Sequence, residues 1–126
     1  MKTIHIAVVA LGGGGGAVAR YVLGGWISVR AGPGFPWGTL VINASGSFVL
    51  CLLATLALER FTLSRTWFIA LGVGFCGGYT TFSTFSYETL RLAAEGSWAR
   101  AGYNVVASVA AGILAGLLGI LVGRAV

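Results

Sequence analysis

Acidic residues are scarce in this chain. Three occur among 126 residues, all of them Glu, and the first one along the sequence is Glu59. Charged residues make up 9% of the sequence, against roughly 25% in an ordinary soluble domain. A chain with so little charge has few groups to present to water. We therefore expect the surrounding solvent to be the hydrocarbon core of a membrane.

The same shortage weakens a nucleotide-binding interpretation of the glycine-rich stretch. Gly12 to Gly16 follow an apolar run and match part of a dinucleotide-binding fingerprint, but that fingerprint needs an acidic residue about 20 positions further on. No acidic residue precedes Glu59, and no Gly-Lys-Ser or Gly-Lys-Thr follows the glycines, which also excludes a phosphate-binding loop. We interpret these glycines as sites of close contact between helices.

Cysteine is also rare, and basic residues are not clustered. Cys51 and Cys76 both lie within apolar stretches and lack ligand-like spacing, so we expect small buried side chains rather than a disulfide or a metal site. The eight Lys and Arg residues are dispersed over short loops instead of forming a basic patch. The sequence therefore predicts no nucleic acid partner.

Long apolar segments fill most of the chain. Apart from Arg20, no Lys, Arg, Asp or Glu occurs in residues 3–29, 31–58, 66–87 or 101–123. A membrane-spanning helix needs about 20 apolar residues. We expect an all-α membrane protein in which residues 1–126 form a single four-span domain, with transmembrane helices at about 4–29, 37–58, 67–93 and 99–123. The first stretch continues past Arg20 without an obvious cleavage site, which favours a span over a signal peptide.

Basic residues are almost evenly shared between the two sides of such a protein. One side holds Lys2, Arg60, Arg65 and Arg124, and the other side holds Arg30, Arg91 and Arg100. The positive-inside rule orients a membrane protein by the difference between its two sides. Because that difference is one residue here, we expect insertion in both orientations and pairing as an antiparallel, dual-topology homodimer.

One polar run interrupts the third apolar segment. Residues 77–88 read Gly-Gly-Tyr-Thr-Thr-Phe-Ser-Thr-Phe-Ser-Tyr-Glu. Backbone groups freed by a break in a membrane helix must be satisfied within the protein or face a water-filled cavity. We expect the third helix to be broken at the membrane midplane near Gly77 and Gly78, and we expect this run to handle a solute.

The residue types around the expected break suit ions of both signs. Phe82 and Phe85 share a helix face, and electropositive ring edges can contact an anion without holding it as tightly as a fixed charge. The alternative is that both rings are ordinary core or lipid-facing aromatics. Carbonyls at the end of the first half-helix, around Gly77 and Thr80, suit a hard cation such as Na⁺.

Arg20 and Asn43 are isolated polar residues within spans. A charge in a span usually faces a protein interior or an aqueous cavity, but Arg20 is placed where snorkelling to the membrane surface is equally consistent. Asn43 either joins helices by hydrogen bonds or donates its amide N–H groups to an anion. Ser108, one turn after Asn104, would extend a polar track along the fourth span.

Three motifs, in this order, resemble the Fluc (CrcB) family of fluoride channels. They are Gly12-Gly13 with Gly16-Ala17 and Arg20-Tyr21, then Trp37 to Asn43 with Gly46-Ser47-Phe48, and then Gly77 to Phe85. The resemblance implies a fluoride-selective channel rather than an enzyme. It implies passive export of cytoplasmic fluoride through two pores of an antiparallel dimer in the inner or plasma membrane of a prokaryote. Its partners would be fluoride, a second copy of the chain and membrane lipid.

The resemblance also implies residue roles. The pore residues would be Asn43, Phe82, Phe85, Ser83, Thr84 and Ser108, and Arg20 would line the vestibule. A structural Na⁺, not transported, would lie at the dimer centre and be held by the backbone carbonyls of Gly77 and Thr80 from both subunits.

Two other classes of function are alternatives to a channel. A small multidrug exporter also has four short spans, but it needs a carboxylate in its first span, which this chain lacks. A non-transporting membrane scaffold would explain the 21 glycines but not the run of hydroxyl and aromatic side chains.

Overall fold

A computed structural model describes residues 3–126 and contains no strand in that range. Its helices are α1 (Thr3–Ala31), α2 (Trp37–Ala54), the π-helix η1 (Thr55–Glu59), α3 (Arg65–Phe68), the π-helix η2 (Ile69–Cys76), α4 (Gly77–Tyr79), α5 (Phe82–Ala94) and α6 (Trp98–Ala125). Joined end to end, they make four stretches long and apolar enough to cross a membrane: Thr3–Ala31, Trp37–Glu59, Arg65–Ala94 and Trp98–Ala125. The prediction of an all-α chain with four membrane helices is confirmed.

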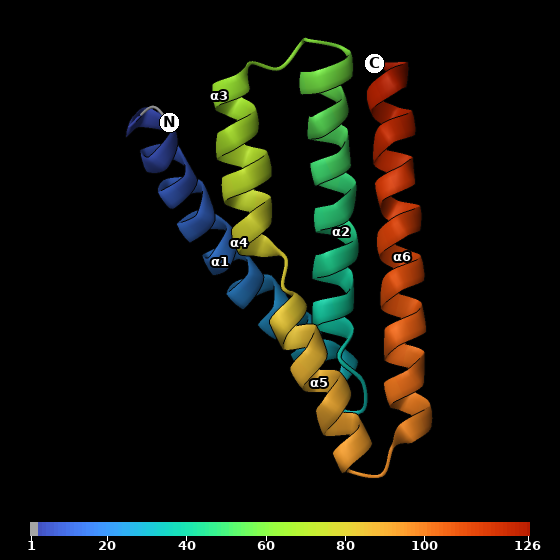
Figure 1. Cartoon of the computed structure of the whole chain (residues 1–126). Helices are drawn as coiled ribbons and strands as arrows, with labels where there is room; N and C mark the ends of the chain where they lie inside the picture. Colours follow the sequence, from blue (N-terminus) through green and yellow to red (C-terminus); the bar gives the residue numbers. More distant parts are fainter. Residues whose placement is uncertain (1–2) are drawn as a thin grey trace.

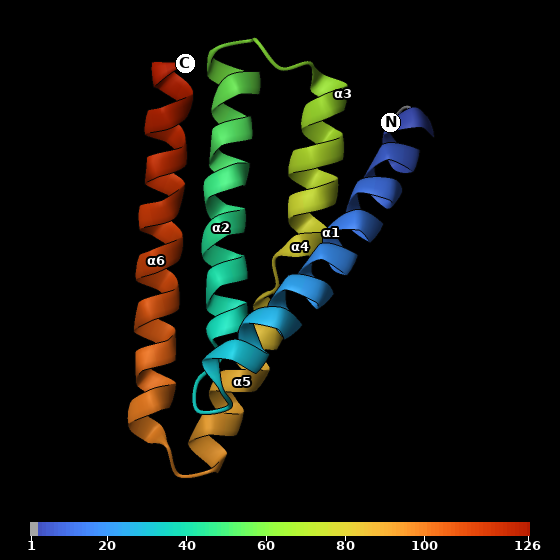
Figure 2. The same cartoon turned by 180° about the vertical axis from the view of Figure 1, so that it is seen from behind.

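The four spans run alternately in opposite directions. The start of α1, the loop 60–64 and the C-terminus lie at one end of the bundle, and the loops 32–36 and 95–97 lie at the other end (Figure 1). Helices α2 and α6 lie side by side along their length, whereas α1 crosses the third span at a tilt (Figure 2). Each end carries three arginines among the described residues, and Lys2, which we also counted, lies outside them.

Glycines bring α1 close to the first half of the third span. A Cβ atom added at Gly16 would overlap the carbonyl oxygen of Phe75, and one added at Gly78 would overlap the carbonyl oxygen of Gly13. In lipid no hydrophobic effect drives helices together, so close van der Waals packing of this kind carries much of their association. The glycine-rich stretch of α1 is therefore a packing surface, in agreement with our interpretation of the sequence.

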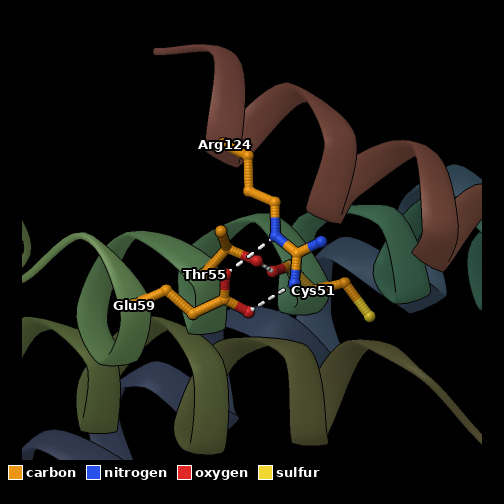
Figure 3. Close-up of polar contacts among 4 residues, drawn as sticks. All are labelled: Cys51, Thr55, Glu59 and Arg124. Atoms are coloured by element: carbon orange, nitrogen blue, oxygen red, sulfur yellow. Dashed lines mark hydrogen bonds and ion pairs between the residues drawn. The ribbon is translucent and has the colours of Figure 1, made fainter.

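A second row of glycines brings α6 close to α2. A Cβ atom added at Gly123 would stand 2.8 Å from Cβ of Thr55, whose buried hydroxyl donates to the carbonyl oxygen of Cys51 at 2.9 Å. One turn later, Glu59 accepts two hydrogen bonds from Arg124, at 2.8 Å from Nε and 3.1 Å from Nη2 (Figure 3). A bidentate ion pair therefore joins η1, which continues α2, to α6 at this end of the bundle.

Aromatic rings join the same two helices at the opposite end. The ring centroid of Phe35 lies 4.7 Å from that of Trp37 on α2 and 5.2 Å from that of Tyr103 on α6. Arg100 adds a long hydrogen bond of 3.4 Å to the carbonyl oxygen of Gly34. The loop 32–36 is thereby held against α6.

Helical backbone geometry is interrupted between α4 and α5. Thr80 has φ −82° and ψ 159°, and Thr81 has φ −154° and ψ 117°, so both residues are extended. Gly77 and Gly78, around which we placed the break, belong to the helix α4 instead. Gly78 is needed there for its contact with α1, because a side chain would meet the backbone of Gly13.

Candidate functional site

Two cavities flank the extended residues. The first has a volume of about 290 Å³ and is lined by residues of α2, α5 and α6, among them Asn43, Phe82, Phe85 and Ser108. The second has a volume of about 190 Å³ and lies between α1, α2 and α5. Thr81 lines both cavities, so the interruption in the third span separates them.

Asn43 holds the interruption in place. Its Nδ2 donates to the carbonyl oxygen of Thr81 at 3.0 Å, and its Oδ1 accepts from the N–H of Thr81 at 2.8 Å. This pairing fixes the orientation of the amide, because the oxygen must face the N–H and the nitrogen must face the carbonyl. An asparagine amide has two N–H donors. One donor of Asn43 is therefore used on the backbone, and one remains beside the first cavity.

The same hydrogen bonds leave two backbone carbonyls without their helical partners. In a continuous helix, the carbonyl of Gly77 would accept from the N–H of Thr81, and that of Thr80 would accept from the N–H of Thr84. The N–H of Thr81 instead bonds to Asn43, and the N–H of Thr84 bonds to the hydroxyl of Thr81 at 3.2 Å. Gly77 and Thr80, whose carbonyls we proposed as cation ligands, thus carry two of the oxygens freed by the interruption.

Arg20 is turned toward the protein interior. Its Nε donates to the carbonyl oxygen of Gly78 at 3.1 Å, and its side chain lines the second cavity together with Thr39, Thr84 and Glu88. The guanidinium thus satisfies one more carbonyl at the end of α4. Within residues 3–126 its remaining N–H groups make no hydrogen bond, so they can act on whatever occupies the cavity.

The two phenylalanine rings lie next to each other at the start of α5. Their centroids are 5.6 Å apart and their planes are tilted by 46°. Phe85 is half-buried, whereas Phe82 is 79% exposed on the surface of the single chain. Thr81 caps this helix, because its hydroxyl oxygen accepts from the N–H of Thr84. The rings therefore stand at a fixed helix start rather than on a mobile loop.

A chain of hydrogen bonds connects α6 to the back of α5. The hydroxyl of Ser108 donates to Asn104 Oδ1 at 3.3 Å, and Asn104 Nδ2 donates to the Thr89 hydroxyl at 2.9 Å. The Thr89 hydroxyl in turn donates to the carbonyl oxygen of Phe85 at 2.8 Å. Asn104 is 1% exposed, so a fully buried amide joins the Ser108 side of the first cavity to the helix that carries the rings.

The structure divides the residues that the sequence singled out. Asn43, Phe82, Phe85 and Ser108 line the first cavity, as does Thr80, whereas Arg20 and Thr84 line the second. Ser83 and Gly77 line neither cavity and are exposed on the surface of the chain, although Ser83 Oγ lies 3.3 Å from the Thr81 hydroxyl.

Three residues of the site were not in our predicted set. Thr81 lies between the cavities, and Thr39 donates its hydroxyl to Oε1 of Glu88 at 2.9 Å. The other carboxylate oxygen of Glu88 is buried and has no hydrogen-bond partner within residues 3–126. Helical spacing could have found two of the three, since Thr39 stands four residues before Asn43 and Glu88 four residues after Thr84.

Comparison with known proteins gives a consistent result over nearly the whole chain. Residues 7–120 match the family described as CrcB-like protein, Camphor Resistance (CrcB). A protein of Acidobacterium capsulatum named fluoride-specific ion channel FluC is 49% identical over 116 residues, which cover 92% of this chain and 93% of that protein.

Two further relatives carry the same name. The protein of Magnetococcus marinus is 48% identical over 121 residues, covering 96% of this chain and 98% of its own. The protein of Trichlorobacter lovleyi is 48% identical over 124 residues, covering 98% of each chain. These names denote ion channels and not enzymes. Together with the four apolar helices, they make the chain a multi-pass membrane protein of a prokaryote. The chain therefore belongs to the CrcB family, the family of Fluc fluoride channels that its three motifs resemble.

Proposed function

We propose that this protein is a fluoride-selective channel that passively exports cytoplasmic fluoride. The name that the relatives share supports fluoride as the transported ion. The residues that line the first cavity support permeation through that cavity. That lining combines two phenylalanine rings, an amide and hydroxyl groups, and it includes no charged side chain.

Such a lining suits an anion that must both enter and leave. Fluoride is strongly hydrated, so groups of the protein have to replace part of its water. Asn43 offers the amide N–H that is not hydrogen-bonded to Thr81, and Phe82 and Phe85 offer ring edges. A lysine or arginine at this position would hold the ion too tightly for rapid release. Arg20, which lines the neighbouring cavity, would attract anions toward the pore without binding them inside it.

The proposed channel is an antiparallel, dual-topology homodimer with two pores. Phe82, Ser83 and Gly77 are all exposed on the single chain, although hydroxyls and freed carbonyls are poorly suited to contact lipid. A second copy would cover this face and complete a pore on each side. The two ends of the bundle differ by one basic residue, four against three, so neither orientation in the membrane is strongly favoured.

The proposed dimer has its third helices broken at the membrane midplane and holds a structural Na⁺ between them. Gly77 and Thr80 each have a carbonyl without its helical partner, so two antiparallel copies would supply four oxygens. Oxygen ligands of this kind suit hard cations. The ion would neutralise converging carbonyl dipoles and hold the two copies together. It would not be transported.

Efflux from reconstituted vesicles tests the proposed function. Liposomes containing the purified protein are loaded with potassium fluoride or potassium chloride, and a potassium ionophore is added to start electrically balanced efflux. We expect rapid fluoride release, recorded by a fluoride electrode, and retention of chloride. Release that requires a proton gradient would favour the exporter, and an absence of fluoride release would leave the scaffold as the better description.

A further inference from the structure

A third cavity lies away from the pore residues, where the loop 60–64 joins η1 to α3. It has a volume of about 520 Å³, and its walls include Leu58, Phe61, Leu63, Phe68 and Ile69. Arg65 is the charged residue that lines it. The cavity lies where the second span ends and the third begins. In a membrane, the ends of such spans lie where lipid head groups meet acyl chains.

The loop that forms one wall is held in an unusual conformation. The N–H groups of Thr62 and Leu63 and the hydroxyl of Thr62 all donate to the carbonyl oxygen of Leu56, at 2.9, 3.3 and 3.2 Å. Phe61 has a φ of 55°, a left-handed conformation that is costly for a bulky residue. The two positive-φ positions at the other end of the bundle are both glycines, Gly32 and Gly96. Here the residue in this conformation is a phenylalanine, which lines the cavity and is 82% exposed.

Arg65 differs from the other two arginines at this end of the bundle. Arg124 is paired with Glu59 (Figure 3), and Arg60 donates to the backbone oxygen of Val126 at 3.1 Å. The guanidinium of Arg65 makes no hydrogen bond or ion pair with any part of the chain that the structure describes. A cation without an acidic partner therefore stands beside an apolar cavity.

We propose that this cavity binds one anionic phospholipid. An acyl chain would lie against Leu58, Phe61 and Phe68, and the phosphate of the head group would pair with Arg65. Basic residues at the border of a membrane protein attract anionic lipids, and guanidinium binds phosphate by paired hydrogen bonds. Free phosphate would gain nothing from the apolar walls, and a zwitterionic lipid would gain less from Arg65. The charge and the apolar lining together therefore favour an anionic lipid.

Fluorescence quenching of a tryptophan in the cavity wall tests the proposal, because Phe68 lines the cavity together with Arg65. A variant with Phe68→Trp, in which the four native tryptophans are replaced by phenylalanine, is reconstituted into vesicles containing brominated phosphatidylglycerol or brominated phosphatidylcholine. We expect quenching to reveal a preference for phosphatidylglycerol of roughly fivefold, the value expected for one arginine near an anionic lipid. Arg65→Gln should abolish this preference. Arg30→Gln, which removes an arginine at the opposite end of the bundle, should leave it unchanged.

A second variant tests the apolar wall. Phe61→Gly removes the ring while allowing the same φ without strain, so the loop should persist while quenching by both lipids weakens. Fluoride efflux should be unaltered in all these variants, which separates this site from the pore. Equal quenching by the two lipids in the parent protein, or an unchanged preference in Arg65→Gln, would overturn the proposal. If Phe61→Gly abolished the dimer while quenching by both lipids stayed unchanged, the cavity would instead be a contact surface for a second copy of the chain.

Discussion

The two halves of the third span are built for different tasks. Residues 65–79 lie against α1 through backbone-to-backbone contacts, such as those of Gly16 with Phe75 and of Gly78 with Gly13. Residues 82–94 carry the hydroxyls and rings, line both cavities and reach α6 through the hydrogen bonds of Asn104. The interruption at Thr80 and Thr81 separates a close-packed support from a polar lining. One span can both pack against α1 and line the cavities, because the interruption lets its second half take a different direction from its first half.

The largest effect is expected where the first half meets α1. Gly16→Ala places a Cβ atom on the carbonyl oxygen of Phe75 and 2.8 Å from the nitrogen of Tyr79, and neither backbone atom can move without separating the helices. We expect a loss of about 3 kcal/mol or more in the free energy of unfolding. Thermal unfolding in detergent, with dimer elution by size-exclusion chromatography, would measure it.

Gly14→Ala is the matched control, since a Cβ atom there meets nothing within 4 Å. It should be neutral or slightly stabilising, because alanine favours a helix more than glycine does. Equal destabilisation by the two substitutions would show that the glycine contacts do not support the first half.

The next largest effect is expected at the junction of the two halves. Asn43→Leu has nearly the same shape but leaves the N–H and the carbonyl of Thr81 without their partners. We expect a loss of about 2 kcal/mol in the free energy of unfolding, together with a strong fall in fluoride efflux. Ser47→Ala, one turn along α2 and lining the same cavity, should stay within about 0.5 kcal/mol because that hydroxyl bonds to its own helix. An unchanged free energy of unfolding in Asn43→Leu would show that the two hydrogen bonds between Asn43 and Thr81 do not stabilise the interruption.

The rings of the second half should affect flux rather than stability. Phe82→Ile or Phe85→Ile removes an electropositive edge while keeping apolar volume, so we expect fluoride efflux to fall by about tenfold or more, or about 1.4 kcal/mol. The dimer should still assemble. Phe75→Ile, in the first half, removes a ring stacked on Tyr79 at 5.7 Å and should leave flux within about twofold. Unchanged efflux in both Phe82 and Phe85 variants would exclude the rings from permeation.

The smallest effect is expected from the helix caps of the two halves. Thr81→Ala removes the cap of α5 and should lower the free energy of unfolding by about 1 kcal/mol. Ser64→Ala removes the cap of α3, whose hydrogen bond to Trp67 is longer, at 3.4 Å, and exposed, so we expect a loss below about 0.5 kcal/mol. Thermal unfolding of both variants would compare them. A larger loss in Ser64→Ala would reverse the expected order of the two halves.

Much of the fold could be predicted from the sequence, and the observed spans end within two residues of the expected bounds. Charge-free runs of this length have no stable alternative to helices in lipid. The position of the interruption was less accessible, since Gly77 and Gly78 are intrinsically flexible and drew the prediction toward them. The extended residues lie a little further on, at Thr80 and Thr81, because Asn43 on another helix holds the backbone there.

The sequence by itself determined the four helices, the near balance of charge between the two ends and the residues most suited to an anion, because these depend on composition and local order. The tertiary structure alone decided how those residues are used. It assigned Thr84 to the Arg20 cavity and Ser108 to the cavity of the rings, and it exposed Ser83. It also freed the carbonyls of Gly77 and Thr80 by directing their usual partners elsewhere. Such choices depend on contacts between residues distant along the chain, which no local pattern specifies.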